Sequence, residues 1–283
     1  MVEFDWLIHY KCNYRCPYCF LEGFWKEVEQ KNKYFPPGAW VNAWKRIYDK
    51  YGEFNMVITG GEPFLYPQFI ILLMELSKYA TLNFDTNFSC EKGELSDLVK
   101  NINPAKIHMS LSFHPLFADL GSFLEKAKFL QRHGFDFIIH YVTFPPQLDS
   151  LECFRDIFTK RGFKFVPIAF RGVYGGKAYP ESFTSDEANR IHNVIIQIED
   201  KKLKEWANNV LLQSKTKDRL CNAGRFYARV DSDGAVYFCG NDYTKSGGKN
   251  CLGNIFEENF SLRDEPTICR QDSCPCEFRW LIS

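Results

Sequence analysis

Apolar and polar positions alternate in two ways along the first 200 residues. Short apolar runs predict six strands, at residues 4–9, 55–59, 81–85, 106–112, 135–142 and 163–169. Apolar residues spaced three and four apart predict helices over 39–51, 67–79, 117–133, 150–160 and 185–201. Strand–helix alternation with short connections predicts parallel strands joined by right-handed crossovers. We therefore expect an α/β fold, a partial (β/α)6 TIM-like barrel with its site at the carboxyl ends of the strands.

The pattern changes after about residue 215. Apolar runs at 226–230 and 236–239 flank Asp231-Ser232-Asp233-Gly234, which predicts a β-hairpin with an Asp-Gly turn. The remainder is rich in Cys and turn residues, and a segment of this kind needs a bound metal for its stability. We expect two domains, a barrel over residues 1–215 and a small Cys-rich domain over residues 216–283.

Charge and hydropathy exclude several classes of protein. The chain has 35 basic and 35 acidic residues, without the basic excess of a nucleic-acid-binding protein. No apolar run approaches the ~18 residues that a membrane span needs. The first six residues lack the apolar core of a secretory signal. We expect a cytoplasmic protein that binds neither nucleic acid nor membrane.

The eleven cysteines carry the clearest chemical signal. Cys12, Cys16 and Cys19 directly follow the first predicted strand, and a second group lies in the last quarter of the chain: Cys221, Cys239, Cys251, Cys269, Cys274 and Cys276. Clustered cysteines in a reducing compartment indicate metal or redox chemistry rather than disulfides. Three thiolates within eight residues can hold one iron–sulfur cubane and leave one iron open. Two alternatives are a zinc-stabilised binding protein, which would need a fourth local ligand, and a non-catalytic iron–sulfur electron-transfer protein.

The segment Cys12-Asn-Tyr-Arg-Cys16-Pro-Tyr-Cys19 resembles the signature of the radical S-adenosylmethionine superfamily, with Tyr18 in the aromatic place before the last cysteine. Gly60-Gly61-Glu62-Pro63 is similar to the family motif that holds the amino group of S-adenosylmethionine. The resemblance implies a [4Fe–4S] cluster on the three cysteines that binds S-adenosylmethionine and cleaves it reductively. The product is a 5′-deoxyadenosyl radical that abstracts hydrogen from a substrate, with electrons from a donor such as flavodoxin or ferredoxin.

Further matches to the family lie at the ends of the later strands. The resemblance implies cofactor contacts from the pair Thr86-Asn87 and from Ser110, Ser112, His140 and Arg171. Each of these residues is explained equally well as an ordinary polar strand end.

The second group of cysteines resembles the SPASM and twitch domains, which hold auxiliary clusters in some radical S-adenosylmethionine enzymes. The likeness rests on Cys221, Gly234 and Cys239 and on the segment Leu252-Gly253-Asn254-Ile255. Six cysteines cannot ligate two cubanes fully, so the shorter twitch type, with one auxiliary [4Fe–4S] cluster, is expected. Its ligands would be Cys221, Cys239 and two of Cys269, Cys274 and Cys276, with Cys251 outside the set. A Cys₄ zinc clip is the alternative.

Members of this family with auxiliary clusters commonly oxidise or cross-link their substrates. The first predicted strand begins near residue 4, which leaves no room before it for a domain that grips a leader peptide. We therefore expect oxidation of a small molecule, a sugar- or aminocyclitol-like alcohol, with a peptide-modifying maturase as the alternative. Candidates for removing a proton from the substrate radical are Glu22, His114, Tyr174 and Arg171, although a solvated loop role also suits each of them.

Overall fold

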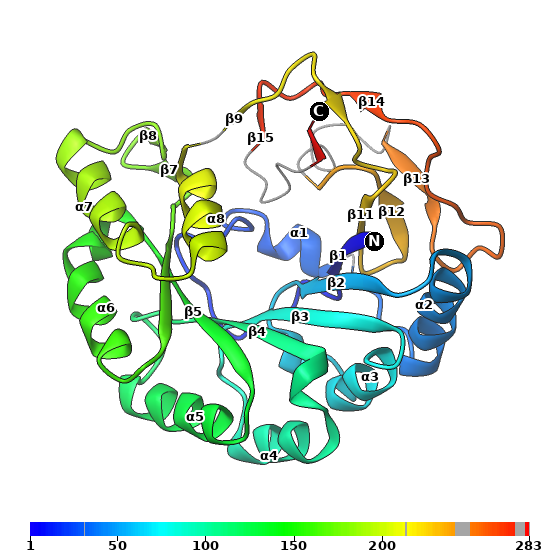
Figure 1. Ribbon diagram of the computed structural model, residues 1–283, viewed down its shortest axis with the longest axis horizontal. Helices are drawn as coiled ribbons and strands as arrows, with labels where there is room; N and C mark the ends of the chain where they lie inside the picture. The colour runs from blue at the N-terminus through cyan, green and yellow to red at the C-terminus, as the bar shows by residue number, and fades with distance from the viewer. Residues whose placement is uncertain (31, 213, 241–249, 275–280, 283) are drawn as a thin grey trace.

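The computed structural model describes residues 1–30, 32–212, 214–240, 250–274 and 281–282. Its centre is a nine-stranded sheet in the order β13-β12-β11-β1-β2-β3-β4-β5-β6. Six consecutive parallel strands form most of this sheet: β1 (Glu3–Leu7), β2 (Phe54–Thr59), β3 (Ala80–Thr86), β4 (Ile107–Ser112), β5 (Asp136–Val142) and β6 (Lys164–Ile168). The expected α/β fold is confirmed, and the curved sheet in Figure 1 is consistent with a partial TIM-like barrel.

Helices connect the parallel strands and surround the sheet on its outer side (Figure 1). The connecting helices are α2 (Pro37–Tyr51), α3 (Phe69–Leu76), α4 (Lys92–Asn101), α5 (Leu120–Arg132) and α6 (Leu151–Thr159). The short helix α1 (Trp25–Gln30) precedes α2, and α7 (Ser185–Ile195) and α8 (Lys201–Leu212) follow β6. In the described part of the chain, none of these helices combines the length and apolarity needed to cross a bilayer.

Two details of the helices differ from the sequence-based expectation. The helix expected over 185–201 ends at Ile195, and α8 begins separately because the Asp200 carboxylate caps it by accepting from the Leu203 amide at 3.0 Å. Helix α4 is not predicted by the apolar pattern, since Leu95 and Leu98 are its only buried residues. A short helix with two buried positions gives a weak periodic signal.

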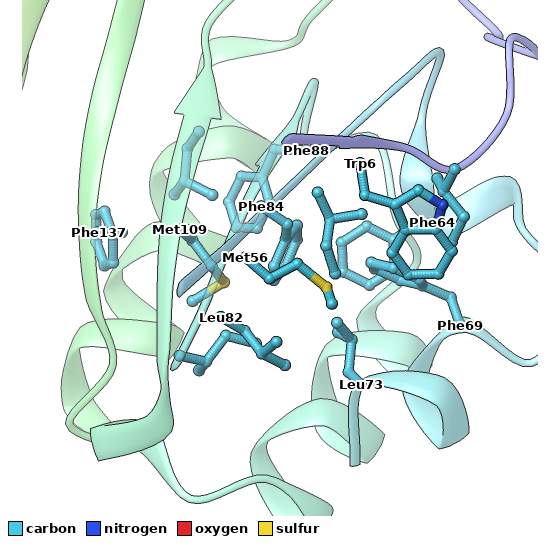
Figure 2. Packing of buried hydrophobic residues seen from close by; sticks show 14 of the residues in the cluster. Trp6, Met56, Phe64, Phe69, Leu73, Leu82, Phe84, Phe88, Met109 and Phe137 are labelled. Carbon is cyan, nitrogen blue, oxygen red and sulfur yellow. The ribbon is translucent and has the colours of Figure 1, made fainter. Parts of the chain in front are cut away.

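The hydrophobic core lies between the outer face of the sheet and the helices. Figure 2 shows Trp6, Met56 and Phe84 from three neighbouring strands packed against side chains that include Leu73 of α3. Successive side chains of a strand point to opposite faces of the sheet, so the residues next to Trp6, Met56 and Phe84 in the sequence point to the concave face. Asp85 follows Phe84 on β3 in this way and lies beside Ser110 of β4 in the register.

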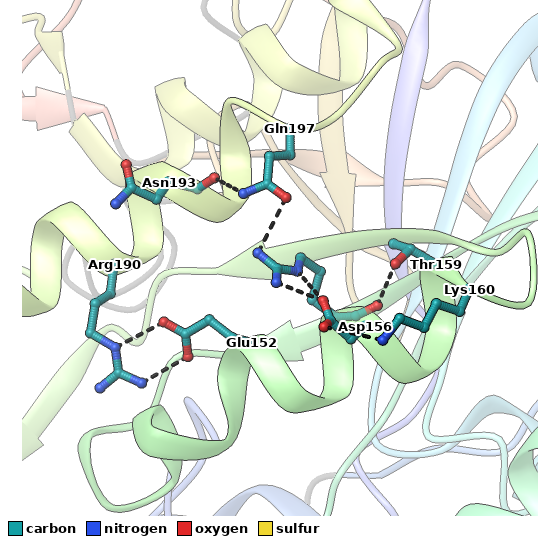
Figure 3. A network of polar contacts seen from close by, with 8 residues as sticks. Glu152, Asp156, Thr159, Lys160, Arg190, Asn193 and Gln197 are labelled. Carbon is teal, nitrogen blue, oxygen red and sulfur yellow. Dashed lines mark hydrogen bonds and ion pairs between the residues drawn. The ribbon is translucent and has the colours of Figure 1, made fainter.

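A polar network fastens α7 to α6 at the surface (Figure 3). Arg190 binds Glu152 at 2.7 Å and Asp149 at 2.8 Å. Arg155 binds Asp156 at 2.6 Å and reaches Gln197 at 3.2 Å. Exposed pairs of this kind each contribute roughly 0–1 kcal/mol, so the network orients α7 more than it stabilises the fold.

The C-terminal region continues the barrel sheet on the far side of β1. Strand β11 (Tyr227–Val230) pairs with β1 in parallel, and β12 (Ala235–Tyr237) and β13 (Cys251–Asn254) follow antiparallel. The expected hairpin is therefore present between β11 and β12. Short two-stranded pairs complete the fold: β7 (Gly172–Tyr174) with β8 (Lys177–Tyr179), β9 (Ser214–Lys215) with β15 (Ser273–Cys274), and β10 (Leu220–Cys221) with β14 (Thr267–Ile268).

Candidate active site

The loops after β1 and β2 are held together by their backbones. The amide of Gly61 donates to the carbonyl of His9 at 2.8 Å, and the amide of Glu62 donates to the carbonyl of Lys11 at 2.9 Å. A Cβ atom on Gly60 would lie 2.4 Å from the His9 oxygen, and one on Gly61 would lie 2.0 Å from the Lys11 oxygen. Only glycine permits so close an approach. The Gly-Gly pair thus fixes the loop that begins at Cys12.

Three cysteines of that loop line one cavity of about 450 Å³ together with Gly60 and Gly61. Burial raises the pKa of all three thiols, to about 12 for Cys16 and to about 11 for Cys19. Near neutral pH these groups hold their protons, and a metal that binds them must displace those protons.

The thiols fit a cluster better than a single ion. Within the described ranges, no three Cys, His, Asp or Glu side chains come close enough to hold one metal ion. A four-iron cubane takes its thiolate ligands on separate corners, so it suits three thiols that line one cavity without meeting at one point. The residues present therefore fit a [4Fe–4S] cluster.

Behind the cysteines, Glu62 holds the turn after β3. Its buried carboxylate accepts from the Phe64 amide at 3.1 Å, from Thr86 Oγ1 at 2.8 Å and from the Asn87 amide at 2.7 Å. Burial raises the pKa of this carboxyl to about 7 despite the three donors. The Glu62 carbonyl also accepts from Nε2 of His9 at 2.9 Å. Glu62 thus supports the site from behind and does not line the cavity.

Asn87 connects this turn to the first cysteine. Its Nδ2 donates to Asn13 Oδ1 at 2.9 Å and lies 3.7 Å from Cys12 Sγ. Its Oδ1 accepts from the amide of Ser89 at 2.9 Å. Both polar atoms of the side chain are therefore used, and the amide points at a thiol.

An aromatic wall forms another side of the cavity. The Tyr18 hydroxyl lies 3.1 Å from Nδ1 of His114, and their rings stack with centroids 5.6 Å apart. Tyr14 packs against His114 on one side and stacks on Phe117 at 4.9 Å. Burial lowers the pKa of His114 to about 4, so its ring is neutral at pH 7 and can accept a proton.

The floor of the cavity consists of charged residues that the motifs do not include. Asp5 of β1, Asp85 of β3 and Arg229 of β11 line it together with Thr59. Arg229 Nη1 lies 3.5 Å from Asp5 Oδ2, and Thr59 Oγ1 donates to Asp5 Oδ1 at 3.2 Å. The alternation of polar and apolar positions in β1 and β3 is a sequence signal that places the two carboxylates on the face opposite the core, but it does not show that this face lines a cavity.

The structure divides the predicted site residues into two sets. The cavity is lined by eight of them outside the cysteines: Tyr18, Gly60, Gly61, Thr86, Asn87, Ser112, His114 and Arg171. The others lie elsewhere: Glu22, Glu62, Pro63, Ser110, His140 and Tyr174. His140 stacks on Trp206 of α8 at 5.5 Å, Tyr174 packs on Phe144 at 4.8 Å, and Glu22 is exposed.

Short strand pairs bring three cysteines of the second group near one another. Cys221 on β10 lies opposite Thr267 of β14, which brings it close to Cys269, and Cys274 lies on β15. The thiolate charges of Cys269 and Cys274 contribute to the raised pKa of Cys221, after the larger effect of burial. Cys239 follows β12, Cys251 is exposed, and Cys276 lies outside the described residues.

Comparison with known proteins identifies related sequences and folds. The family model of the Radical SAM superfamily matches residues 6–165. Streptococcus suis SuiB has a TM-score of 0.64 at 17% sequence identity, over 91% of this chain and 64% of SuiB, and one of its structures contains the precursor peptide SuiA. Native anSMEcpe with bound AdoMet and the Kp18Cys peptide has a TM-score of 0.63 at 20% identity, over 90% of this chain and 78% of that chain. At such identities the likeness shows a shared fold, and this chain spans less than two thirds of SuiB. No curated protein sequence matches the chain.

Proposed function

This chain belongs to the radical SAM superfamily, and from that premise we propose that it cleaves S-adenosylmethionine reductively and abstracts hydrogen from a side chain of a peptide. The observation that carries the proposal is the single cavity that joins Cys12, Cys16 and Cys19 to the Gly60-Gly61 pair. When bound there, the [4Fe–4S] cluster and S-adenosylmethionine would supply a 5′-deoxyadenosyl radical.

Each part of the cavity has a separate role in this proposal. The three thiols hold the cluster once their protons are displaced. Gly60 and Gly61 line the cavity, and their backbone would bind the amino group of S-adenosylmethionine, while the missing side chains let the loop after β1 pack against them. Ser112 and Arg171 line the cavity and can contact the cofactor. His114, neutral at pH 7, accepts the proton that leaves when a substrate radical is oxidised.

A peptide substrate is supported by the folds that the chain resembles. SuiB binds the precursor peptide SuiA, and anSMEcpe binds the Kp18Cys peptide. The second candidate is oxidation of a small polar alcohol. The charged floor of the cavity favours it, because Asp5, Asp85 and Arg229 suit a ligand rich in polar groups.

The auxiliary cluster is also part of the proposal. Cys221, Cys269 and Cys274 lie close enough for their charges to interact, as ligands of one [4Fe–4S] cluster would. Cys239 is a further ligand in this proposal, and Cys276 remains a candidate outside the described residues. The cluster would accept the electron left on the oxidised substrate, while a flavodoxin or ferredoxin reduces the first cluster.

The test compares iron content and S-adenosylmethionine cleavage in anaerobic, reconstituted protein. Wild type and a Cys153→Ala control, altered at an exposed thiol on α6, should release 5′-deoxyadenosine on reduction. A variant with Cys12, Cys16 and Cys19 all changed to Ala should release none and keep about half of the iron, because one cluster of two remains. Wild-type protein that holds its iron yet makes no 5′-deoxyadenosine would contradict the proposal, and so would protein that holds zinc without iron.

A further inference from the structure

The floor of the cavity is built from strands that the cofactor motifs do not use. Strands β1 and β11 pair in parallel with Asp5 opposite Arg229, and both side chains reach the cavity. Asp85 enters from β3, where its neighbour on β4 is Ser110. The sheet register thus places two carboxylates and one guanidinium at the inner end of the space that opens at the cysteines.

Asp5 is already provided with partners. It accepts from Thr59 Oγ1 at 3.2 Å, and the Tyr227 hydroxyl and Arg229 Nη1 each lie 3.5 Å from its Oδ2. Its side chain is 16% exposed and that of Arg229 is 11% exposed. The two charges therefore offset each other in a largely buried pair.

Asp85 has fewer interactions than Asp5. Ser110 gives it one side-chain hydrogen bond, and within the described part of the chain no cation lies within ion-pair distance of its carboxylate. Asp85 is partly buried, and an ionised carboxylate that is largely withdrawn from water without a charged partner is costly, so its place is explained if a ligand completes it. We propose that Asp85 binds a protonated primary amine of the substrate at the floor of the cavity. This inference rests on the proposed function, whose substrate it describes.

The charges around Asp85 favour an ammonium group over other ligands. Arg229 is paired with Asp5, so the floor carries the net negative charge of Asp85 when this carboxyl is ionised. A carboxylate or phosphate would be repelled by the charge of Asp85, and a hydroxyl could donate a hydrogen bond but would bring no positive charge to offset that of the carboxylate. The described residues offer no set of three ligands for a metal ion.

The amine should bind in a pH-dependent manner. Burial, with a smaller contribution from Asp5, raises the pKa of Asp85 to about 6. The other charged or titratable groups that face this cavity are Asp5, Arg171, Arg229, His114, Tyr14, Tyr18 and the three cysteines. Alkylamines stay protonated up to about pH 10, so affinity should be present above pH 6 and lost below it.

Two kinds of substrate carry such an amine. A peptide can present the ammonium of a lysine side chain at the end of an apolar stem, and an amino sugar or aminocyclitol can present a ring amine. Both substrates carry a primary ammonium, but a lysine joins it to an apolar stem and an amino sugar or aminocyclitol joins it to a polar ring.

The first experiment measures binding to the reconstituted holoenzyme with S-adenosylmethionine, without oxygen, by titration calorimetry. The probes are n-butylammonium and its near-isostere n-butanol. At pH 7.5 the ammonium should bind at least about tenfold more tightly than the alcohol, and Asp85→Asn should remove that difference. Asp97→Asn, a change at an exposed carboxylate on α4, should leave it intact. Equal binding of the two probes, or an unchanged preference in Asp85→Asn, overturns the proposal.

A second variant tests the proposal even if Asp85→Asn fails to fold. Ser110→Ala keeps the carboxylate but removes a hydrogen bond that lowers the pKa of Asp85, so the pH below which the ammonium is lost should rise. An unchanged pH profile in Ser110→Ala would contradict the role of Asp85.

The two substrate classes are distinguished with a blocked Gly-Lys-Gly peptide and with glucosamine, each perdeuterated. The measurement is the transfer of deuterium from each compound to 5′-deoxyadenosine. Transfer from the peptide indicates a lysine side chain, and transfer from glucosamine an amino sugar. Binding and cleavage are measured separately. Ammonium binding without any 5′-deoxyadenosine would refute the proposed function alone, and cleavage without ammonium preference would refute this inference alone.

Discussion

Substituting alanine for Gly61 tests how the cluster loop is positioned. The added Cβ would lie 2.0 Å from the Lys11 oxygen and 2.7 Å from the Tyr10 oxygen, whereas ordinary contact begins at 3.4 Å. The loop must therefore move by about 1.4 Å at its closest point. That movement breaks the hydrogen bonds from Gly61 to His9 and from Glu62 to Lys11.

The size of the effect follows from these contacts. Overpacking costs about 1–3 kcal/mol, and each lost hydrogen bond costs about 0.5–1.5 kcal/mol. The variant should lose roughly 2–6 kcal/mol of stability, which for a chain of this size lowers the melting temperature by roughly 4–24 °C. Because the displaced segment leads directly into Cys12, the reconstituted variant should also lose the iron of the first cluster.

The assay is thermal unfolding of the metal-free protein together with iron content after reconstitution. Gly93→Ala is the matched control, since nothing lies within 4 Å of a Cβ at that position and it lies in helix α4. It should be neutral or stabilise the protein by about 0.5–1 kcal/mol. A Gly61→Ala protein with the melting temperature and iron content of wild type would refute this account of the loop.

Three further substitutions probe other parts of the site. Burial lowers the pKa of His140 to about 3. Between pH 7 and pH 5 the unfolded chain therefore takes up a proton at this residue and the folded chain does not. The free energy of unfolding should fall by about 2 kcal/mol over that interval because of His140. His140→Phe should lose less stability over that interval in urea titrations; an equal loss would contradict the assignment. Asn87→Ala should lower the reduction potential of the first cluster in redox titrations followed by electron paramagnetic resonance, because an N–H directed at Cys12 Sγ stabilises the more negative reduced state. The exposed Asn101→Ala serves as its control, and equal potentials would exclude this role. Lys126→Met should destabilise the fold by about 2–4 kcal/mol in urea, since Nζ donates to the buried carbonyls of Phe88 and Cys90; a change below 0.5 kcal/mol would refute it.

The parallel strands, and the proximity of the loops that begin at Cys12 and Gly60, could be predicted from the sequence for physical reasons. Each strand is a short apolar run between turn residues, and such runs identify buried parallel strands. Cys12 and Gly60 come close because both follow the carboxyl ends of adjacent parallel strands. Their proximity therefore follows from topology, without knowledge of any side-chain contact.

The floor of the cavity could not be predicted in the same way. A polar residue at an alternate strand position, such as Asp85, is usually solvent-facing, and only the curvature of the sheet turns that face into an interior. Arg229 lies opposite Asp5 because β11 pairs with β1, and a hairpin signal in the sequence does not say which third strand the hairpin joins. The pairing of β11 with β1 joins segments that lie on either side of residue 215 in the sequence.

The place of β1 in the middle of the sheet has a consequence for biosynthesis. Its partner β2 is made early, but β11 leaves the ribosome only when more than four-fifths of the chain has been synthesised. Until then β1 is an open edge, a template for pairing with other chains. Contacts between distant segments also form slowly. One side of β1 would therefore stay unpaired in the nascent barrel until β11 is made. The same strand brings Arg229 to the floor of the cavity.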